Sequence, residues 1–318
     1  MLEFEKYPSI NQYRQVVKEV NRCSTLGPSE TTLNFKGTVK AHGTNAGFQY
    51  DPSTGEYLTQ SRNRVISLGD DNAGFAKFCD EYLDDLISIC KSVKDDSNII
   101  TLFGEWCGEN IQKGVALAEL PKMFIIFGVK IGERWLVLPP SLNYICKAPI
   151  YCINEFPTFS IDIDFSRPEE SQELLEQATM RVEEECPIGK YLGVSGVGEG
   201  IVWTHNSSHG LFRFKVKGQK HSVSKVKTLA PVDTVKMANI RTFVDYTVTE
   251  NRLKQGMDEV FTQNNIEPSQ KGTGDFLRWI IKDIHKEESD TLEDSGLDPK
   301  EVNKYLSEKA RKWFFSNF

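Results

Sequence analysis

The stretch Lys40-Ala41-His42-Gly43-Thr44-Asn45 places a lysine at a corner between two predicted strands, residues 34–40 and 46–50. The two strands are expected to form a hairpin joined through this corner. Gly43 lets the backbone turn closely against a ligand, and the Asn45 amide offers both a donor and an acceptor. Taken alone, such a hexapeptide is more often an ordinary hairpin corner, so its interpretation depends on the motifs that follow it.

A lysine at such a corner suits nucleotidyl transfer. A neutral amine can attack the α-phosphorus of a nucleoside triphosphate and form a covalent lysyl-nucleotide. A free lysine, with a pKa of about 10.4, is almost wholly protonated at neutral pH. Burial, a neighbouring cation or a metal ion disfavours that charge. Lys40 is therefore the first candidate nucleophile.

Bulk composition sets the limits of the interpretation. With 318 residues and 39% hydrophobic content, the chain can bury a full core and has room for a large and a small domain. No stretch approaches the ~20 apolar residues of a membrane span, and residues 1–6 lack the pattern of a signal peptide. We expect a soluble, intracellular protein with no membrane partner. The seven cysteines contain no Cys-x-x-Cys pair and are expected to be reduced core thiols.

Charge is unevenly distributed. The net charge of −7 argues against a protein that coats nucleic acid nonspecifically. One segment, residues 213–241, is nevertheless strongly basic. Its cations are Arg213, Lys215, Lys217, Lys220, Lys225, Lys227, Lys236 and Arg241. This segment either contacts a polyanion or forms a solvated edge whose lysines guard against aggregation.

Periodicity predicts an α+β fold with antiparallel sheets and flanking helices, followed by a small all-helical domain. A turn is expected at 51–55, because Asp51-Pro52-Ser53-Thr54-Gly55 is rich in turn residues. The predicted strands after it are 98–104, 123–131, 135–138, 199–204 and 211–217. The predicted helices are 73–91, 168–185, 244–261, 274–286 and 299–318. The change in pattern places a boundary near 235–242, which gives domains at 1–240 and 241–318.

Four further motifs carry chemistry. Glu105 stands between glycines at the end of an apolar strand, where a carboxylate can accept hydrogen bonds from ribose hydroxyls. Phe127 ends another apolar strand and is suited either to stacking on a purine or to the core. Glu199 opens the next strand. Lys215 and Lys217 share one face of the last strand, and two adjacent cations there need an anion such as a triphosphate.

Together and in this order, these motifs resemble those of the ATP-dependent RNA ligases of the phage RNA ligase 2 type, which include the kinetoplastid RNA-editing ligases. The resemblance spans nearly the whole chain, including the opening residues 4–9 and the tail segment 248–252. It implies that residues 1–240 form a nucleotidyltransferase (adenylyltransferase) domain. It also implies that residues 241–318 form a helical domain that engages RNA.

The resemblance implies catalytic roles for several residues. Lys40 would take AMP from ATP, His42 would assist beside it, and Glu199 would act near a divalent metal, Mg²⁺ or Mn²⁺. Lys215 and Lys217 would hold the phosphates during the transfer. The implied nucleotide-binding residues are Lys40, Ala41, Asn45, Arg62, Glu105, Phe127, Lys215 and Lys217.

Two points in this assignment stay open. Arg62 matches the arginine that meets phosphate, but Arg64 fits the same role after a small shift of register. The second open point is the contact with the base. Glu105 would bind ribose and Phe127 would stack on adenine, but the residue after Phe127 is Gly128, whereas the family commonly has an acid at that position.

The implied function is an ATP-dependent RNA ligase that seals 3′-hydroxyl and 5′-phosphate RNA ends, expected at nicks in duplex RNA, in RNA repair. The reaction would pass through lysyl-AMP and an adenylylated RNA 5′ end, and the protein is expected to be a monomer. The alternatives are a DNA ligase, a GTP-dependent mRNA capping guanylyltransferase, or a nucleotide- or RNA-binding module without catalysis. The first two normally carry a β-rich OB-fold after the Lys-x-Lys strand, whereas this tail is predicted to be helical.

Overall fold

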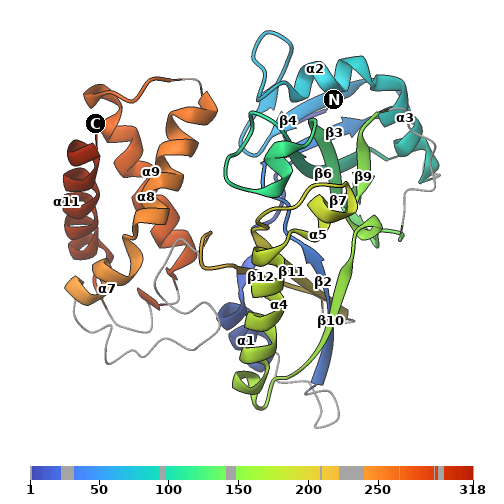
Figure 1. Cartoon of the computed structure of the whole chain (residues 1–318). Helices are drawn as coiled ribbons and strands as arrows, with labels where there is room; N and C mark the ends of the chain where they lie inside the picture. The colour runs from blue at the N-terminus through green and yellow to red at the C-terminus, as the bar shows by residue number, and fades with distance from the viewer. Residues whose placement is uncertain are drawn as a thin grey trace. The chain divides into compact units, whose positions relative to one another are not determined.

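The computed structural model describes residues 2–22, 32–93, 98–140, 148–207, 210–221, 240–264, 266–289, 291–292 and 297–317 (Figure 1). The chain divides into two compact units, each built from separate segments. The first unit comprises Met1–Ser9, Lys36–Ser160 and Met180–Val202. The second comprises Ile10–Phe35, Ile161–Thr179 and Trp203–Phe318. The predicted division at residue 240 stays a prediction.

The first unit contains a seven-stranded sheet in the order β5-β4-β3-β6-β7-β8, with β9 beside β7. Neighbours along this order pair antiparallel, and β9 pairs parallel with β7. The strands are β3 (Thr44–Tyr50), β4 (Tyr57–Ser61), β5 (Val65–Ile66), β6 (Ile100–Cys107), β7 (Met123–Ile131), β8 (Arg134–Leu136) and β9 (Ile150–Cys152).

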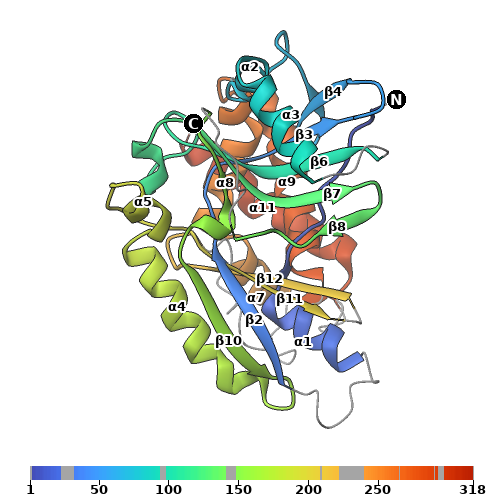
Figure 2. The ribbon, with the colours of Figure 1, turned by 90° about the vertical axis from the view of Figure 1, so that its right-hand side faces the viewer.

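Two helices, α2 (Phe75–Glu81) and α3 (Leu83–Ser92), cover one face of this sheet (Figure 2). Their apolar residues pack with those of β3, β6 and β7 into one core, because side chains on alternate strand positions point to the same face. The opposite face of β6 carries Phe103 and Glu105. This unit also contains α5 (Pro187–Tyr191), the last residues of α4 (Gln172–Glu184) and 3-10 turns at Ala116–Glu119 and Ile153–Glu155.

The second unit contains β1 and β12 and parts of β2, β10 and β11, which form a five-stranded sheet in the order β1-β12-β11-β2-β10. Its strands are β1 (Asn11–Gln12), β2 (Thr32–Val39), β10 (Thr158–Asp164), β11 (Gly200–Ser207) and β12 (Gly210–Lys217), and its first helix is α1 (Tyr13–Arg22). A 3-10 turn at Pro168–Ser171 leads into α4. On β12, buried Phe212, Phe214 and Val216 alternate with partly exposed Arg213, Lys215 and Lys217. This alternation confirms that the two lysines share a face.

The tail of the second unit is helical. It contains α7 (Ile240–Thr247), α8 (Glu250–Val260), α9 (Thr273–Glu287) and α11 (Pro299–Asn317), with 3-10 turns at Thr262–Asn264 and Gln270–Gly272. The helices α8, α9 and α11 pack side by side (Figure 1) around a core that includes Phe243, Phe276 and Phe314. The predicted α+β fold with antiparallel sheets, flanking helices and a helical tail is therefore confirmed.

Three local predictions were wrong. The predicted helix 244–261 is two helices, α7 and α8, because the backbone is extended at Thr249, the N-cap of α8. Residues 34–40 and 46–50 do not pair as a hairpin, because β2 lies in the five-stranded sheet and β3 pairs with β4 and β6. The hairpin in this region is instead β3–β4, closed by the predicted turn, where the Asp51 N–H donates to the Glu56 carbonyl. The predicted helix 73–91 is split at Tyr82, whose φ of −113° and ψ of 32° separate α2 from α3.

The described cysteines agree with the expected core thiols. Cys79, Cys90, Cys107, Cys152 and Cys186 are free and buried, whereas Cys23 and Cys146 lie outside the described residues. Within the described ranges, no helix has both the length and the apolar character that a membrane crossing needs. Lys225, Lys227 and Lys236 of the basic segment also lie outside the described residues.

Candidate active site

Lys40 follows the last residue of β2, and its backbone is tied to the start of β11. The Lys40 N–H donates to the Gly200 carbonyl at 2.8 Å. This contact brings Glu199, the residue just before β11, beside the lysine side chain. Lys40 Nζ lies 2.7 Å from Glu199 Oε2, and the two side chains are 21% and 2% exposed. A nearly buried carboxylate thus fixes the ammonium of the predicted nucleophile.

His42 contacts the same carboxylate oxygen. Its Nδ1 lies 3.0 Å from Glu199 Oε2, so one oxygen serves both the lysine and the imidazole. The predicted residues Lys40, His42 and Glu199 are therefore brought together. Within the described ranges, no three His, Cys, Asp or Glu side chains gather closely enough to hold a metal ion by themselves.

Gly43 joins this cluster to Glu105 of β6. Its N–H donates to Glu105 Oε1 at 2.9 Å, and β3 sets Asn45 directly opposite Glu105. A Cβ on Gly43 would lie 2.2 Å from the Trp106 carbonyl oxygen, so only glycine fits between the corner and β6. The predicted residue Ala41, next to Lys40, is buried.

Burial raises the pKa of the Glu105 carboxyl. The positive charges of Lys40 and His42 oppose this shift, and the negative charge of Glu199 reinforces it. These interactions mean that the four groups act on one another electrostatically. The first unit therefore holds a compact cluster of a lysine, a histidine and two carboxylates.

Phe127 lies in a β-bulge of β7. Phe103 pairs with Gly128 and Gly104 pairs with Ile126, which leaves Phe127 as the extra residue. Its partly exposed ring packs edge-on against Tyr7, with centroids 4.9 Å apart. Tyr7 also contacts Phe103, which alternation places on the same face of β6 as Glu105. Phe127 therefore lies on the Glu105 face of the sheet, away from α2 and α3.

Arg62 and Arg64 follow β4 and differ in their contacts. Arg64 Nη1 lies 2.5 Å from Asp70 Oδ2 and also donates to the Asp70 carbonyl. Arg62 is exposed, and within the part of the chain that the structure describes it makes no hydrogen bond or ion pair. Arg64 is thus held by its own chain, whereas Arg62 faces solvent.

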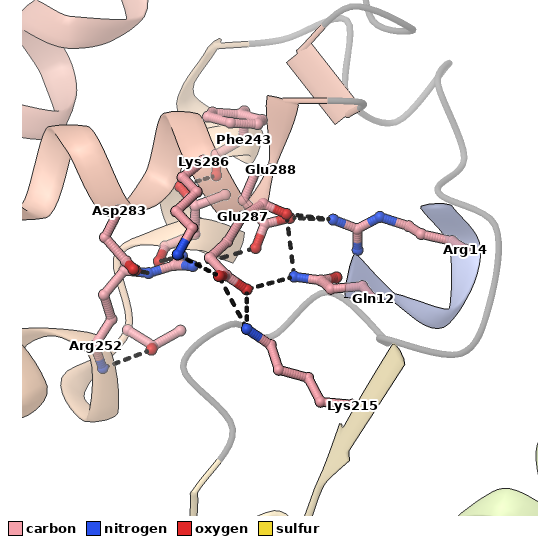
Figure 3. Close-up of polar contacts among 11 residues, drawn as sticks. Gln12, Arg14, Lys215, Phe243, Arg252, Asp283, Lys286, Glu287 and Glu288 are labelled. Carbon is pink, nitrogen blue, oxygen red and sulfur yellow. Dashed lines mark hydrogen bonds and ion pairs between the residues drawn. The ribbon is translucent and has the colours of Figure 1, made fainter. Parts of the chain in front are cut away.

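Lys215 and Lys217 lie on β12, in the second unit. Lys215 Nζ is 2.9 Å from Glu287 Oε2 and 3.0 Å from Oε1, at the end of α9 (Figure 3). The pair of cations was expected to need an anion. In the structure that anion is a carboxylate of the same chain.

Sequence reasoning missed two residues near predicted ones. Tyr7 was seen only as part of a family-like opening segment, and nothing local indicated that its ring packs on Phe127. Glu287 was not selected either, yet it is only 8% exposed. It directly follows the helix predicted at 274–286, and its spacing of three residues from buried Ile284 was the signal available.

Comparison with known proteins identifies the family. The family model described as RNA ligase matches residues 34–217, a range that contains every predicted site residue from Lys40 to Lys217. No curated protein sequence matches this chain.

Solved structures similar to this chain include Naegleria gruberi RNA ligase with PPi, at 16% identity and a TM-score of 0.44. That alignment covers 68% of this chain and 56% of the other. A variant of the same ligase with ATP and Mn is 15% identical, with a TM-score of 0.44 and coverages of 69% and 57%. This chain thus spans less than two thirds of the length of those chains. Because the family model matches more than half of its 318 residues, the chain belongs to the RNA ligase family.

Proposed function

We propose that this protein is an ATP-dependent RNA ligase that seals 3′-hydroxyl and 5′-phosphate RNA ends through a lysyl-AMP intermediate. The observation that carries the proposal is the contact of Lys40 Nζ with Glu199 Oε2 at 2.7 Å, inside the family match. It gives the lysine a defined position beside a buried carboxylate. A covalent nucleophile needs such a defined position.

In the first step, the Lys40 amine attacks the α-phosphorus of ATP. A nitrogen–phosphorus bond forms, the bond from the α-phosphorus to the bridging oxygen breaks, and pyrophosphate leaves. The lysine gives up its extra protons to solvent or to a neighbouring base. Glu199 contributes position and charge compensation at Lys40 Nζ, and His42 contacts the same Glu199 oxygen as the lysine. Catalysis of such transfers depends mainly on positioning and electrostatics.

The nucleotide would bind along the face of the first unit that carries Glu105 and Phe127. The Glu105 carboxylate already accepts the Gly43 N–H and retains acceptor capacity for ribose hydroxyls. Asn45 lies opposite Glu105 in the β3–β6 register, where its amide can add a polar contact. The partly exposed ring of Phe127, braced by Tyr7, is suited to stacking on adenine.

The donor set also fits a divalent metal. Mg²⁺ takes oxygen ligands, keeps several waters, and is commonly bound by one or two carboxylates together with substrate phosphates. Glu199 supplies such a carboxylate beside Lys40, and its charge acts on that of Glu105. Glu199 would hold the metal, directly or through water, and the bound ion would neutralise charge on the triphosphate.

The later steps would act on RNA. A 5′-phosphate oxygen attacks the phosphorus of lysyl-AMP, the nitrogen–phosphorus bond breaks, and Lys40 regains its proton. The RNA 3′-hydroxyl oxygen then attacks the 5′-phosphate, a phosphodiester bond forms, and AMP leaves. The helical tail would engage duplex RNA through the exposed cations of α11, which are Lys304, Arg311 and Lys312.

The alternatives can be separated. A DNA ligase or a capping guanylyltransferase would carry a β-rich domain after the Lys-x-Lys strand. Within the described residues after Lys217, helices and 3-10 turns are present and no strand is. A binding module without catalysis would leave Lys40 unmodified.

The test is an intact-mass spectrum of the purified full chain after incubation with Mg²⁺ and ATP, GTP or no nucleotide. A single added AMP, formed only with ATP and absent in Lys40→Ala, supports the proposal. Added GMP would indicate a capping enzyme. No adduct, even after treatment with pyrophosphate to discharge AMP already bound, would favour a binding module.

A further inference from the structure

We infer that Gly198 is a positioning residue that holds Glu199 against Lys40. The inference rests on the proposed function only in taking Lys40 as the nucleophile, because the contact of Lys40 Nζ with Glu199 Oε2 at 2.7 Å is a feature of the structure itself. Glu199 is 2% exposed, and the same carboxylate oxygen also contacts His42. The backbone that carries Glu199 therefore determines both contacts.

Residues 196–198, just before Glu199, are held by backbone hydrogen bonds to three different elements of the first unit. These bonds run from the Cys186 N–H to the Gly196 carbonyl at 2.8 Å, from the Ala116 N–H to the Val197 carbonyl at 2.9 Å, and from the Gly198 N–H to the Val182 carbonyl at 3.0 Å. Cys186 precedes α5, Ala116 begins a 3-10 turn, and Val182 lies in α4. Residues 196–198 lie outside the strands, so these bonds fix the path of the chain towards Glu199.

Gly198 packs against α4 more closely than a residue with a side chain could. A Cβ at this position would lie 2.5 Å from the Val182 carbonyl oxygen and 2.8 Å from Val182 Cγ1. Cβ contacts in proteins are essentially never shorter than 3.0 Å, so residue 198 would have to move by about 0.5 Å or more. Gly198 does not have a positive φ. The close approach to Val182, rather than the backbone conformation, therefore requires glycine here.

The residue after Glu199 is anchored as well. The Gly200 carbonyl accepts the Lys40 N–H at 2.8 Å. Glu199 thus lies between two backbone positions that are each hydrogen-bonded to another part of the first unit. The ion pair with Lys40, at 2.7 Å, is at the short end of the range for a charge-assisted hydrogen bond. A displacement of residue 198 should therefore lengthen or break this ion pair.

The expected consequence is a loss of rate. A misplacement of about 1 Å can cost a reaction roughly a hundredfold, even when the altered residue does not contact the reacting atoms. Gly198→Ala should lower the single-turnover rate of AMP transfer to Lys40 by about tenfold to a hundredfold. In a chain that already carries Glu199→Gln, the same change should have little further effect, because the carboxylate that Gly198 positions is gone.

A second measurement does not depend on activity. Urea unfolding of the unmodified chain and of Lys40→Met, Glu199→Gln and the double variant gives the coupling free energy between Lys40 and Glu199. The same four chains are then prepared with Gly198→Ala. The coupling should be present in the first set and lost in the second. A merely structural role of Gly198 would lower the stability of all four chains equally and leave the coupling unchanged.

Two further variants serve as controls. Ser195→Ala alters an exposed residue of the same segment and removes only the contact of its hydroxyl with Glu185 at 3.4 Å. It should leave both the rate and the coupling unchanged. In Gly196→Ala, the added Cβ would lie 3.0 Å from Ala116 Cα and 3.1 Å from Ala116 Cβ, so a smaller shift suffices. This variant should lose less rate and less coupling, and it replaces Gly198→Ala if that chain fails to fold.

The outcomes separate the inference from the proposed function. Full rate and full coupling in Gly198→Ala would overturn the inference. Equal losses of rate with and without the Glu199 carboxylate, together with unchanged coupling, would make Gly198 a structural support and would also overturn it. No AMP transfer in the unmodified protein would overturn the proposed function, whereas loss of the coupling in Gly198→Ala would still support the positioning of Glu199.

Discussion

Lys40 and Glu199 are 159 positions apart in the chain, yet Lys40 Nζ and Glu199 Oε2 lie 2.7 Å apart. The hydrogen bond from the Lys40 N–H to the Gly200 carbonyl sets this distance, because it fixes the end of β2 to the start of β11. The lysine therefore meets its carboxylate only in the folded chain. A nucleophile held in this way depends on the packing of the whole first unit.

Replacing Lys40 tests its role as the carrier of AMP. Lys40→Ala should abolish AMP transfer from ATP and the sealing of 5′-phosphate RNA. Sealing of RNA that is already adenylylated should persist in part, because that step does not form a bond to lysine. Gel assays with the two RNA substrates measure both activities.

Lys36→Ala is the matched control for this experiment. Lys36 lies on β2, the strand that ends just before Lys40, is exposed and donates to Asn154 Oδ1 at 3.0 Å. Its replacement should leave both activities intact. Complete loss of sealing of adenylylated RNA in Lys40→Ala would show that Lys40 does more than carry AMP.

The close approach of Gly43 to β6 gives a second prediction. In Gly43→Ala, the added Cβ would lie 2.2 Å from the Trp106 carbonyl oxygen and 2.7 Å from Cys107 Cβ, so the corner must move. The Gly43 N–H would lose Glu105, and AMP transfer should fall by roughly a hundredfold or more. Gly69→Ala, where nothing lies within 4 Å of the added Cβ, should have no effect. Equal rates in the two variants would contradict the geometry of the corner.

Local patterns in the sequence were sufficient for most elements. The strand predicted at 123–131 is β7 with the same bounds, and the tail is helical as predicted. Both follow from periodicity that a single segment carries by itself. The wrong prediction of a hairpin shows that a local pattern does not determine how strands pair. Alternation indicates that 34–40 and 46–50 are strands, but the partner of each strand is set by packing elsewhere in the chain.

For the candidate site as well, local motifs indicated individual residues but not their distant partners. Lys40, His42, Glu105 and Glu199 were selected from motifs, and the structure brings them together. Glu287 was not selected, because its local composition is that of a charged surface. Its burial depends on Lys215, which is 72 positions away, and on the β1–α1 segment. No local pattern encodes contacts of that range.

The contacts of Arg62 and Arg64 predict which arginine meets phosphate. Arg64 is engaged by Asp70, whereas Arg62 is exposed to solvent. Arg62→Ala should therefore lower the rate of AMP transfer at subsaturating ATP by about tenfold, a typical effect of losing one charge-assisted contact. Arg64→Ala should have a smaller effect. Single-turnover kinetics over a range of ATP concentrations decide between them, and the reverse order would assign the phosphate contact to Arg64.

The pKa of Glu287 predicts how stability depends on pH. Its folded-state pKa of about 2 lies below the ordinary value of 4.5, so its contribution to the free energy of unfolding is fully present above pH 4.5. The contribution is lost as the pH falls from 4.5 towards 2. It amounts to roughly 3 kcal/mol at most. Urea unfolding across this range should show Glu287→Gln less stable than the unmodified protein near neutral pH, with the difference shrinking in acid. A difference that does not change with pH would refute this account.

The exposed cations of α11 give a prediction for RNA. In the double variant Arg311→Ala and Lys312→Ala, binding of nicked duplex RNA should weaken at low salt. The slope of log affinity against log salt should fall by about two, because two phosphate contacts are lost. AMP transfer to Lys40 should be unchanged, since this step does not involve RNA. Lys254→Ala is the control, because Lys254 is exposed but paired with Glu250 at 2.9 Å. Fluorescence anisotropy over a salt series measures binding, and an unchanged slope in the double variant would place RNA engagement on another surface.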